Sequence, residues 1–219
     1  MLQVCWSPKG GSGTSVVAAA MAVQSAAAGR DTVLVDLDGD QSAIFGVDAG
    51  DGVGDWFAAA ADVGPDALRS LEVELSERLR LVRRGGAASA EWSPERMAVA
   101  MAVFDRRPEV VIVDGGRHSG EGLPPRAASV AVVRACYLGV RRLARAPRDN
   151  GRVVVVEAPG RALSRRDLEA VLGELDVVLA WDPAVARAID AGLLGSRIPR
   201  SLRPLRQLLA PAAAGSARP

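Results

Sequence analysis

The chain has 219 residues, of which 49% are hydrophobic and 24% are charged, and its formal net charge at pH 7 is +1. This length is sufficient for one sizeable core, whereas the near-neutral charge gives no global basic field for nucleic acid. No apolar run reaches the length of a membrane span, because Asp, Arg or Gly interrupts each one. We therefore expect one domain over residues 1–209, followed by a flexible C-terminal tail over residues 210–219.

Short apolar segments alternate with longer segments of helical character. Residues 33–35, 110–113 and 153–156 are continuously apolar, as expected of parallel strands that are buried on both faces. The alternation predicts an α/β fold with a doubly wound, mostly parallel sheet flanked by helices, and ligands are expected at the carboxyl ends of its strands. Strands are predicted over 3–6, 32–36, 79–82, 110–114, 129–133, 152–156 and 177–180, and helices over 15–28, 54–61, 65–71, 94–105, 137–145, 164–172, 184–191 and 201–209.

Lys9 is the single lysine among 27 basic residues, and it lies in a glycine-rich segment between the first expected strand and the first expected helix. Such a segment can direct backbone N–H groups at a phosphate. Compared with the phosphate-loop motif G-x-x-x-x-G-K-[ST], the chain has Thr14 in place of the lysine but keeps Ser15, whose hydroxyl can bind Mg²⁺. A glycine-rich turn without a ligand is the alternative interpretation.

Carboxylates follow two of the expected strands. Asp114 ends an apolar run and precedes two glycines, which is the Walker B pattern that holds Mg²⁺ through water near the Ser15 hydroxyl. Asp36 and Asp38 end the second expected strand in the same way. An ordinary solvated strand-to-loop transition, where Asp is common, is the alternative.

Residues Lys9–Ser15 resemble the deviant Walker A motif of the ParA/MinD ATPases, written KGGxGK[ST]. In that family the first lysine reaches the partner's phosphates across a nucleotide-sandwich dimer, so the resemblance implies a homodimer and this role for Lys9. Thr14 departs from the second lysine, as in the CpaE/TadZ pilus-localisation branch, which residues 163–173 and 182–192 also resemble, together with the septum-site-determining group. The resemblance covers most of residues 1–209. It implies that ATP is bound by Lys9, Gly10, Gly11, Ser12, Gly13, Thr14 and Ser15.

The same resemblance implies roles for the carboxylates. The residue that matches Asp38 orients the attacking water in active family members, and the one that matches Asp36 lies nearer Mg²⁺. Gly39 and Asp40 separate Asp38 from Gln41, so the register of this loop departs from the family pattern. Lys9 and Asp38 are therefore the candidate catalytic residues, and the candidate Mg²⁺ ligands are Ser15, Asp36 and Asp114.

Trp181, Asp182 and Pro183 resemble the family's later D-P turn, which lies near the nucleotide base. Trp181 could stack on that base or could simply be a half-buried aromatic residue. Glu157 replaces the Asn that reads adenine in many relatives, which weakens the inference of adenine selectivity.

Other features bear on partners and location. The two cysteines, Cys5 and Cys136, lie in apolar segments without metal-like spacing and are interpreted as buried, reduced thiols of a cytoplasmic protein. Residues 201–209 contain a proline and are expected to pack on the domain, so any membrane association would be indirect. A solvated face is the preferred interpretation of a small arginine cluster, which argues against DNA binding. Its members are Arg141, Arg142, Arg145 and Arg148.

Three functions remain open. The first is a cytoplasmic positioning or assembly factor that binds ATP and Mg²⁺ with weak or no hydrolysis. Its expected partners are proteins of a Tad-type pilus or polar machinery. The second is an active ATPase in chromosome or plasmid partition or in septum placement. The third is a nucleotide-free interaction scaffold that kept only the fold. Loss of the lysine at Thr14 favours slow hydrolysis, since positioned charge supplies most of the rate of phosphoryl transfer.

Overall fold

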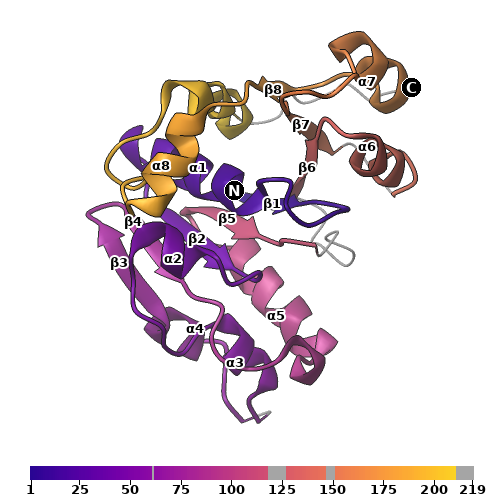
Figure 1. The fold of residues 1–219 in the computed structure, drawn as a ribbon. Coiled ribbons are helices and arrows are strands. Elements are labelled where there is room, and N and C mark those ends of the chain that lie inside the picture. Colours follow the sequence, from indigo (N-terminus) through magenta and orange to yellow (C-terminus); the bar gives the residue numbers. More distant parts are fainter. Residues whose placement is uncertain (61, 118–126, 147–150, 211–219) are drawn as a thin grey trace.

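A computed structural model describes residues 1–60, 62–117, 127–146 and 151–210. These residues form an eight-stranded sheet in the order β3-β4-β2-β5-β1-β6-β7-β8, in which every neighbouring pair is parallel except β3 and β4 (Figure 1). The predicted α/β fold with a mostly parallel sheet is confirmed. The strands are β1 (Leu2–Trp6), β2 (Thr32–Asp36), β3 (Glu72–Ser76), β4 (Leu79–Val82), β5 (Val110–Asp114), β6 (Ala128–Arg134), β7 (Arg152–Val156) and β8 (Val177–Leu179).

Helices cover both faces of the sheet (Figure 1). Because successive strand residues point to opposite faces, Leu34 and Ile112 pack beneath α1, whereas Val33 and Val111 pack on the side of α3 and α5. The helices are α1 (Thr14–Ala27), α2 (Gln41–Phe45), α3 (Val53–Ala58), α4 (Ala67–Ser70), α5 (Pro94–Asp105), α6 (Tyr137–Leu143), α7 (Arg165–Leu172) and α8 (Pro183–Asp190), with 3₁₀ segments η1 (Ser89–Glu91) and η2 (Arg200–Leu209).

The last segment, η2, packs on the domain as predicted. Its leucines at 202, 205 and 208 recur every three residues, the period of a 3₁₀ helix, and are buried in the core shared with α1. Gln3 and Arg152 both donate hydrogen bonds to the Leu208 carbonyl oxygen, at 2.6 and 2.7 Å. No helix in the described ranges is long and apolar enough to cross a bilayer. The expected tail beyond residue 210 lies outside the described residues.

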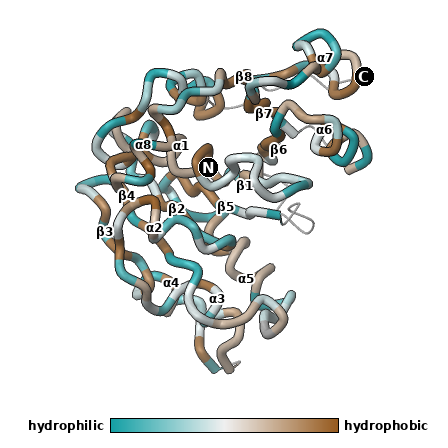
Figure 2. The backbone as a smooth tube through the Cα atoms, viewed as in Figure 1, coloured by the Kyte–Doolittle hydropathy of each residue, from teal (hydrophilic) through white to brown (hydrophobic). Residues whose placement is uncertain are grey.

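One strand and one α-helix were not predicted, nor was the short segment η1. β3 is a half-exposed, antiparallel edge strand with only two apolar residues, Val73 and Leu75, so its sequence lacks the continuous apolar run of the buried strands. α2 has five residues, too few to show a helical period. Figure 2 shows both hydrophilic and hydrophobic residues on α7, of which Leu168 and Leu172, four residues apart, are buried.

The two cysteines differ in burial. Cys5 is buried and free, and burial raises the pKa of its thiol far above the usual range. Cys136 is also free, but it is only half-buried. The expectation of buried thiols is therefore right for Cys5 and wrong for Cys136, because Cys136 lies in the turn between β6 and α6, where packing is incomplete.

Candidate functional site

The glycine-rich segment forms a tight loop between β1 and α1. Gly11 and Gly13 have φ angles of 73° and 89°, in the left-handed region that favours glycine. The Ser7 and Ser12 hydroxyls both donate to the Lys9 carbonyl oxygen, at 2.8 and 2.7 Å, which closes the loop on itself. The first turn of α1 contains no acidic residue, and the positive end of the helix dipole faces the loop.

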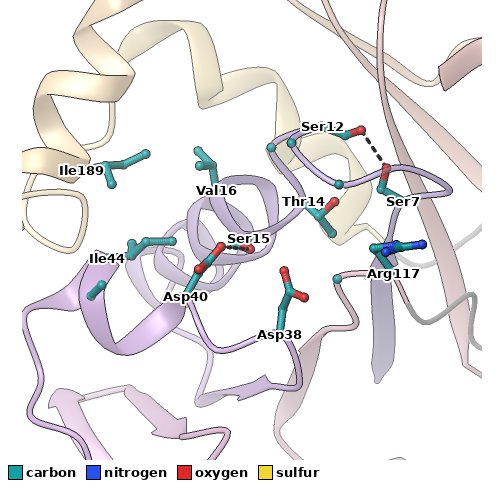
Figure 3. Close-up of a pocket in the computed structure, with 15 residues that line it drawn as sticks. Ser7, Ser12, Thr14, Ser15, Val16, Asp38, Asp40, Ile44, Arg117 and Ile189 are labelled. Atoms are coloured by element: carbon teal, nitrogen blue, oxygen red, sulfur yellow. Dashed lines mark hydrogen bonds between the residues drawn. The ribbon is translucent and has the colours of Figure 1, made fainter. Parts of the chain in front are cut away.

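A pocket of about 430 Å³ lies against this loop (Figure 3). Its apolar side is formed by Val16, Ile44 and Ile189, and Asp38 and Asp40 lie on another side. The carboxyl ends of β1, β2 and β5 therefore meet at one pocket, as expected for ligand sites in parallel sheets. The lining residues are Ser7, Gly10, Gly11, Ser12, Gly13, Thr14, Ser15, Val16, Asp38, Asp40, Ala43, Ile44, Gly116, Arg117 and Ile189.

The two lysine positions of the motif lie in different places. Thr14 lines the pocket and is only 7% exposed, so a neutral side chain stands where the motif has its second lysine. Lys9 does not line the pocket of its own chain. Its exposed Nζ atom donates to the Gly10 carbonyl oxygen at 3.3 Å. Lys9 is thus on the outside of the loop, where a second molecule could meet it.

Asp36 shapes the loop that follows β2. Its carboxylate oxygens accept hydrogen bonds from the backbone N–H groups of Asp38, Gly39 and Gln41, at 3.0, 2.7 and 3.0 Å. Burial raises the pKa of Asp36, although these three bonds oppose the shift. The side chain that was predicted to approach Mg²⁺ therefore has both oxygens occupied in holding the loop.

Gln41 connects the two halves of the site, a role that the sequence did not predict. Its Nε2 atom donates to Asp114 Oδ2 at 2.7 Å and to the Ser15 carbonyl oxygen at 3.0 Å. Burial raises the pKa of Asp114 to about 7, and the nearby charge of Asp36 adds to the shift. The two-residue separation of Asp38 from Gln41 is accommodated because Gln41 begins α2 and points back into the site.

Asp38 and Asp40 lie at the mouth of the site, and both are exposed. The Ser15 hydroxyl donates to Asp40 Oδ2 at 3.2 Å (Figure 3). Asp38 lies so close to Gly116 that a Cβ atom there would overlap its carboxylate, and Gly116 also has a φ of 53°. The second glycine after β5 is therefore required for this approach.

The donor set fits Mg²⁺ with a nucleotide. Ser15, Asp40 and Asp114 present oxygen atoms close together, and the buried Oε1 atom of Gln41 has no hydrogen-bond partner within the described residues, which leaves an acceptor for a metal-bound water. In the described ranges no three His, Cys, Asp or Glu side chains are arranged to hold a metal ion by themselves. Mg²⁺ in nucleotide sites commonly uses one or two protein oxygens together with phosphates and water.

The predicted base-binding turn does not line this pocket. The Arg134 guanidinium lies 5.1 Å from the centre of the Trp181 ring, which is 48% exposed. Asp182 is the N-cap of α8, where its carboxylate accepts from the Ala184 N–H at 2.8 Å and from the Ser201 hydroxyl at 2.7 Å. Pro183 is the first residue of that helix. From this region Ile189 in α8 lines the pocket instead. Nothing in the local sequence around Ile189 predicted that contact.

Comparisons with known proteins identify the fold. No family model matches the sequence, and no curated protein does. Among solved structures, the ParA family ATPase of Chlorobium tepidum is 19% identical, with a TM-score of 0.76 over 94% of this chain and 97% of the other. The MinD cell division protein of Aquifex aeolicus is 16% identical, with a TM-score of 0.77 over 97% and 98%. The septum site-determining protein MinD of Pyrococcus horikoshii, solved with Mg-ADP, is 16% identical, with a TM-score of 0.73 over 94% and 93%.

The identities lie below 20%, whereas almost the whole of each chain superimposes. The likeness is therefore one of fold. The chain has the fold of the ParA and MinD ATPases, as the resemblance of residues Lys9–Ser15 predicted.

Proposed function

We propose that this protein is a ParA/MinD-type switch that binds Mg-ATP in the pocket beside the glycine-rich loop. The observation that carries the proposal is the open N-terminus of α1, with two left-handed glycines before it and Asp114 close to the Ser15 end of the helix. Backbone N–H groups there can bind phosphate, and the oxygen donors can hold Mg²⁺. The MinD structure with Mg-ADP supports this assignment through the shared fold.

The bound state would be a homodimer in which Lys9 completes the partner's site. Lys9 is half-buried, but its Nζ atom is exposed and lies outside the pocket of its own chain, which supports a contact with a second copy. Lys9→Ala is therefore expected to abolish dimer formation with a non-hydrolysable ATP analogue and to leave the unfolding temperature unchanged. Light scattering after size exclusion measures the mass. Arg145→Ala, an exposed change on the turn after α6, is the control, and a Lys9→Ala protein that still dimerises contradicts the proposal.

Hydrolysis would be slow or absent. The pocket has neutral Thr14 where the motif has a lysine, and a missing charge on the transferring phosphate removes transition-state stabilisation. Thr14→Lys is expected to raise phosphate release, at saturating Mg-ATP, by about tenfold or more. Turnover no higher than that of the unmodified protein would show that another group limits the reaction.

Its biological role would be a cytoplasmic positioning or assembly factor for a Tad-type pilus or related polar machinery, with recruitment to a pole or septum through protein partners. The motif pattern of the CpaE/TadZ branch supports this role. An active partition or septum-placement ATPase is the second candidate, favoured by the cell division MinD proteins among the structural matches. One of these was solved with MinC as a protein partner.

Mg-ATP titration by calorimetry, on protein freed of nucleotide, is the first test. Micromolar binding is the expected result. No heat at millimolar Mg-ATP would overturn the proposal and leave a nucleotide-free scaffold. Rapid turnover stimulated by DNA, lipid or a partner would instead favour the partition or septum ATPase.

A further inference from the structure

The charge inside the pocket is unbalanced for a nucleotide. Of the described residues that line it, Asp38 and Asp40 are anionic, and Arg117 is the only cation. Lys9 lies outside, and Thr14 is neutral. A triphosphate bound by a single chain would therefore meet one positively charged side chain, apart from its Mg²⁺.

Arg117 is held against the glycine-rich loop through its backbone. It directly follows Gly116, whose carbonyl oxygen accepts from the Ser7 N–H at 2.8 Å, and the Gly116 N–H donates to Asp114 Oδ1 at 3.2 Å. These bonds fix the segment to both β1 and the Walker B carboxylate. The Arg117 Cδ atom lies 4.0 Å from where a Gly10 Cβ atom would stand. This is an ordinary van der Waals distance, so the Arg117 side chain lies alongside the loop at Gly10.

The side chain is available for a ligand. Arg117 is exposed, and its guanidinium forms no hydrogen bond or ion pair with another described residue. Figure 3 shows it beside Ser7 and Thr14, on the side of the pocket away from Ile44 and Ile189. A guanidinium there can form paired hydrogen bonds to phosphate oxygens.

We propose that Arg117 replaces the missing lysine at Thr14 as the intrachain cation that binds the terminal phosphate of the nucleotide. The inference rests on the proposed nucleotide site and names a residue within it. The terminal phosphate is the expected contact because Arg117 directly follows Gly116, which approaches Asp38 at the mouth of the pocket. This arrangement makes ATP preferred over ADP without a Walker lysine.

The test compares Mg-ATP and Mg-ADP binding by calorimetry in wild type and in Arg117→Gln. Since a charged hydrogen-bonding partner is lost, the affinity for ATP is expected to fall about tenfold or more, and that for ADP by less than about threefold. Arg117→Lys keeps the charge but lacks the planar guanidinium, so its affinity for ATP is expected to lie between those of wild type and Arg117→Gln. Adding Thr14→Lys to Arg117→Gln is expected to restore most of the ATP affinity.

Arg142→Gln is the matched control, because it makes the same change at an exposed position on α6 outside the pocket. Unfolding temperatures of all variants verify that they fold. Suppose that wild type binds ATP. This inference alone is overturned if Arg117→Gln binds ATP as tightly as wild type does, or if the substitution lowers the affinities for ADP and ATP by the same factor. If wild type does not bind ATP, inorganic triphosphate is the probe. If wild type binds triphosphate and Arg117→Gln does not, Arg117 binds phosphate although the proposed ATP function is wrong. If wild type does not bind triphosphate, both proposals are overturned.

Discussion

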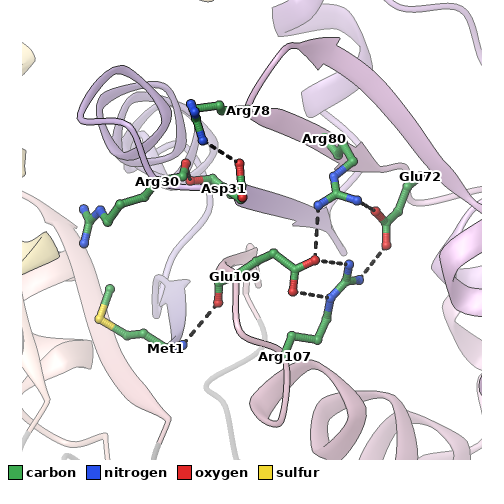
Figure 4. A network of polar contacts seen from close by, with 9 residues as sticks. Met1, Arg30, Asp31, Glu72, Arg78, Arg80, Arg107 and Glu109 are labelled. Atoms are coloured by element: carbon green, nitrogen blue, oxygen red, sulfur yellow. Dashed lines mark hydrogen bonds and ion pairs between the residues drawn. The ribbon is translucent and has the colours of Figure 1, made fainter.

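The two ends of strand β5 hold their charges in opposite ways. At its amino end, Arg107 and Arg80 are shared between Glu72 and Glu109, with nitrogen–oxygen distances of 3.0 Å for Arg107–Glu109 and 3.0 Å for Arg80–Glu72 (Figure 4). The Arg107 and Glu72 side chains are each only 5% exposed. This end of the sheet is thus closed by a buried network of paired ions.

At the carboxyl end, Asp114 is buried beside Asp36, and neither forms an ion pair with a described residue. The hydrogen bond from Arg107 lowers the pKa of Glu109 to about 2, whereas burial raises that of Asp114 to about 7. Paired charges at one end serve the fold, and an unpaired carboxylate at the other can accept a cation. The contrast supports the proposed site at the carboxyl end.

Breaking the paired end should have the largest effect. Arg107→Met leaves Glu72 and Glu109 without their shared buried cation and is expected to lower the free energy of unfolding by about 3–5 kcal/mol. Urea denaturation measures the loss. Arg106→Met, the exposed neighbour, should change it by less than about 0.5 kcal/mol. Equal effects of the two substitutions would contradict a structural role for the network.

Neutralising the unpaired end should stabilise the nucleotide-free protein. Because the folded pKa of Asp114 is raised, its contribution is present below the unfolded value of about 3.9 and is lost as the pH rises through about 7. Asp114→Asn stays neutral and is expected to be about 2–4 kcal/mol more stable than wild type at pH 8, with little difference at pH 4. Urea denaturation at both pH values measures the difference in stability. If Asp114→Asn is no more stable than wild type at pH 8, the buried charge of Asp114 does not destabilise the fold.

Glu109 should respond to pH with the opposite sign. Its folded pKa is lowered, so its contribution is present above the unfolded value of about 4.3 and is lost as the pH falls towards 2. Glu109→Gln is expected to cost about 1–2 kcal/mol at pH 7, reduced by screening at the partly exposed Arg80, and much less near pH 2.5. Thermal unfolding across this range measures it, and a cost independent of pH would mean that packing rather than charge is lost.

The sequence predicted the carboxylates at the carboxyl end of β5 but none of the ion pairs at its amino end. Asp36 and Asp114 follow continuous apolar runs, which is a local signal. Glu72 lies in an edge strand without such a run, and it meets Arg107 through antiparallel pairing of β3 with β4. Long-range contacts of this kind have no signature in local periodicity.

The same division holds within the site. The loop 9–15 was predicted because its glycines and hydroxyls are consecutive, and the fold followed from apolar runs at regular intervals. Arg117 and Ile189 were not predicted, because they reach the pocket from a loop after β5 and from α8. Their separate positions in the chain gave no pattern to recognise.

The sequence by itself determined the layered α/β architecture and the glycine-rich loop, because both depend on residues that are neighbours in the chain. Tertiary structure alone decided that Asp36 shapes a loop, that Gln41 joins Asp114 to α1, and that Arg117 is the cation of the pocket. The physical reason is that burial, charge and hydrogen bonding depend on distance in space, and the fold brings together residues that are far apart in sequence, such as Val16 and Ile189.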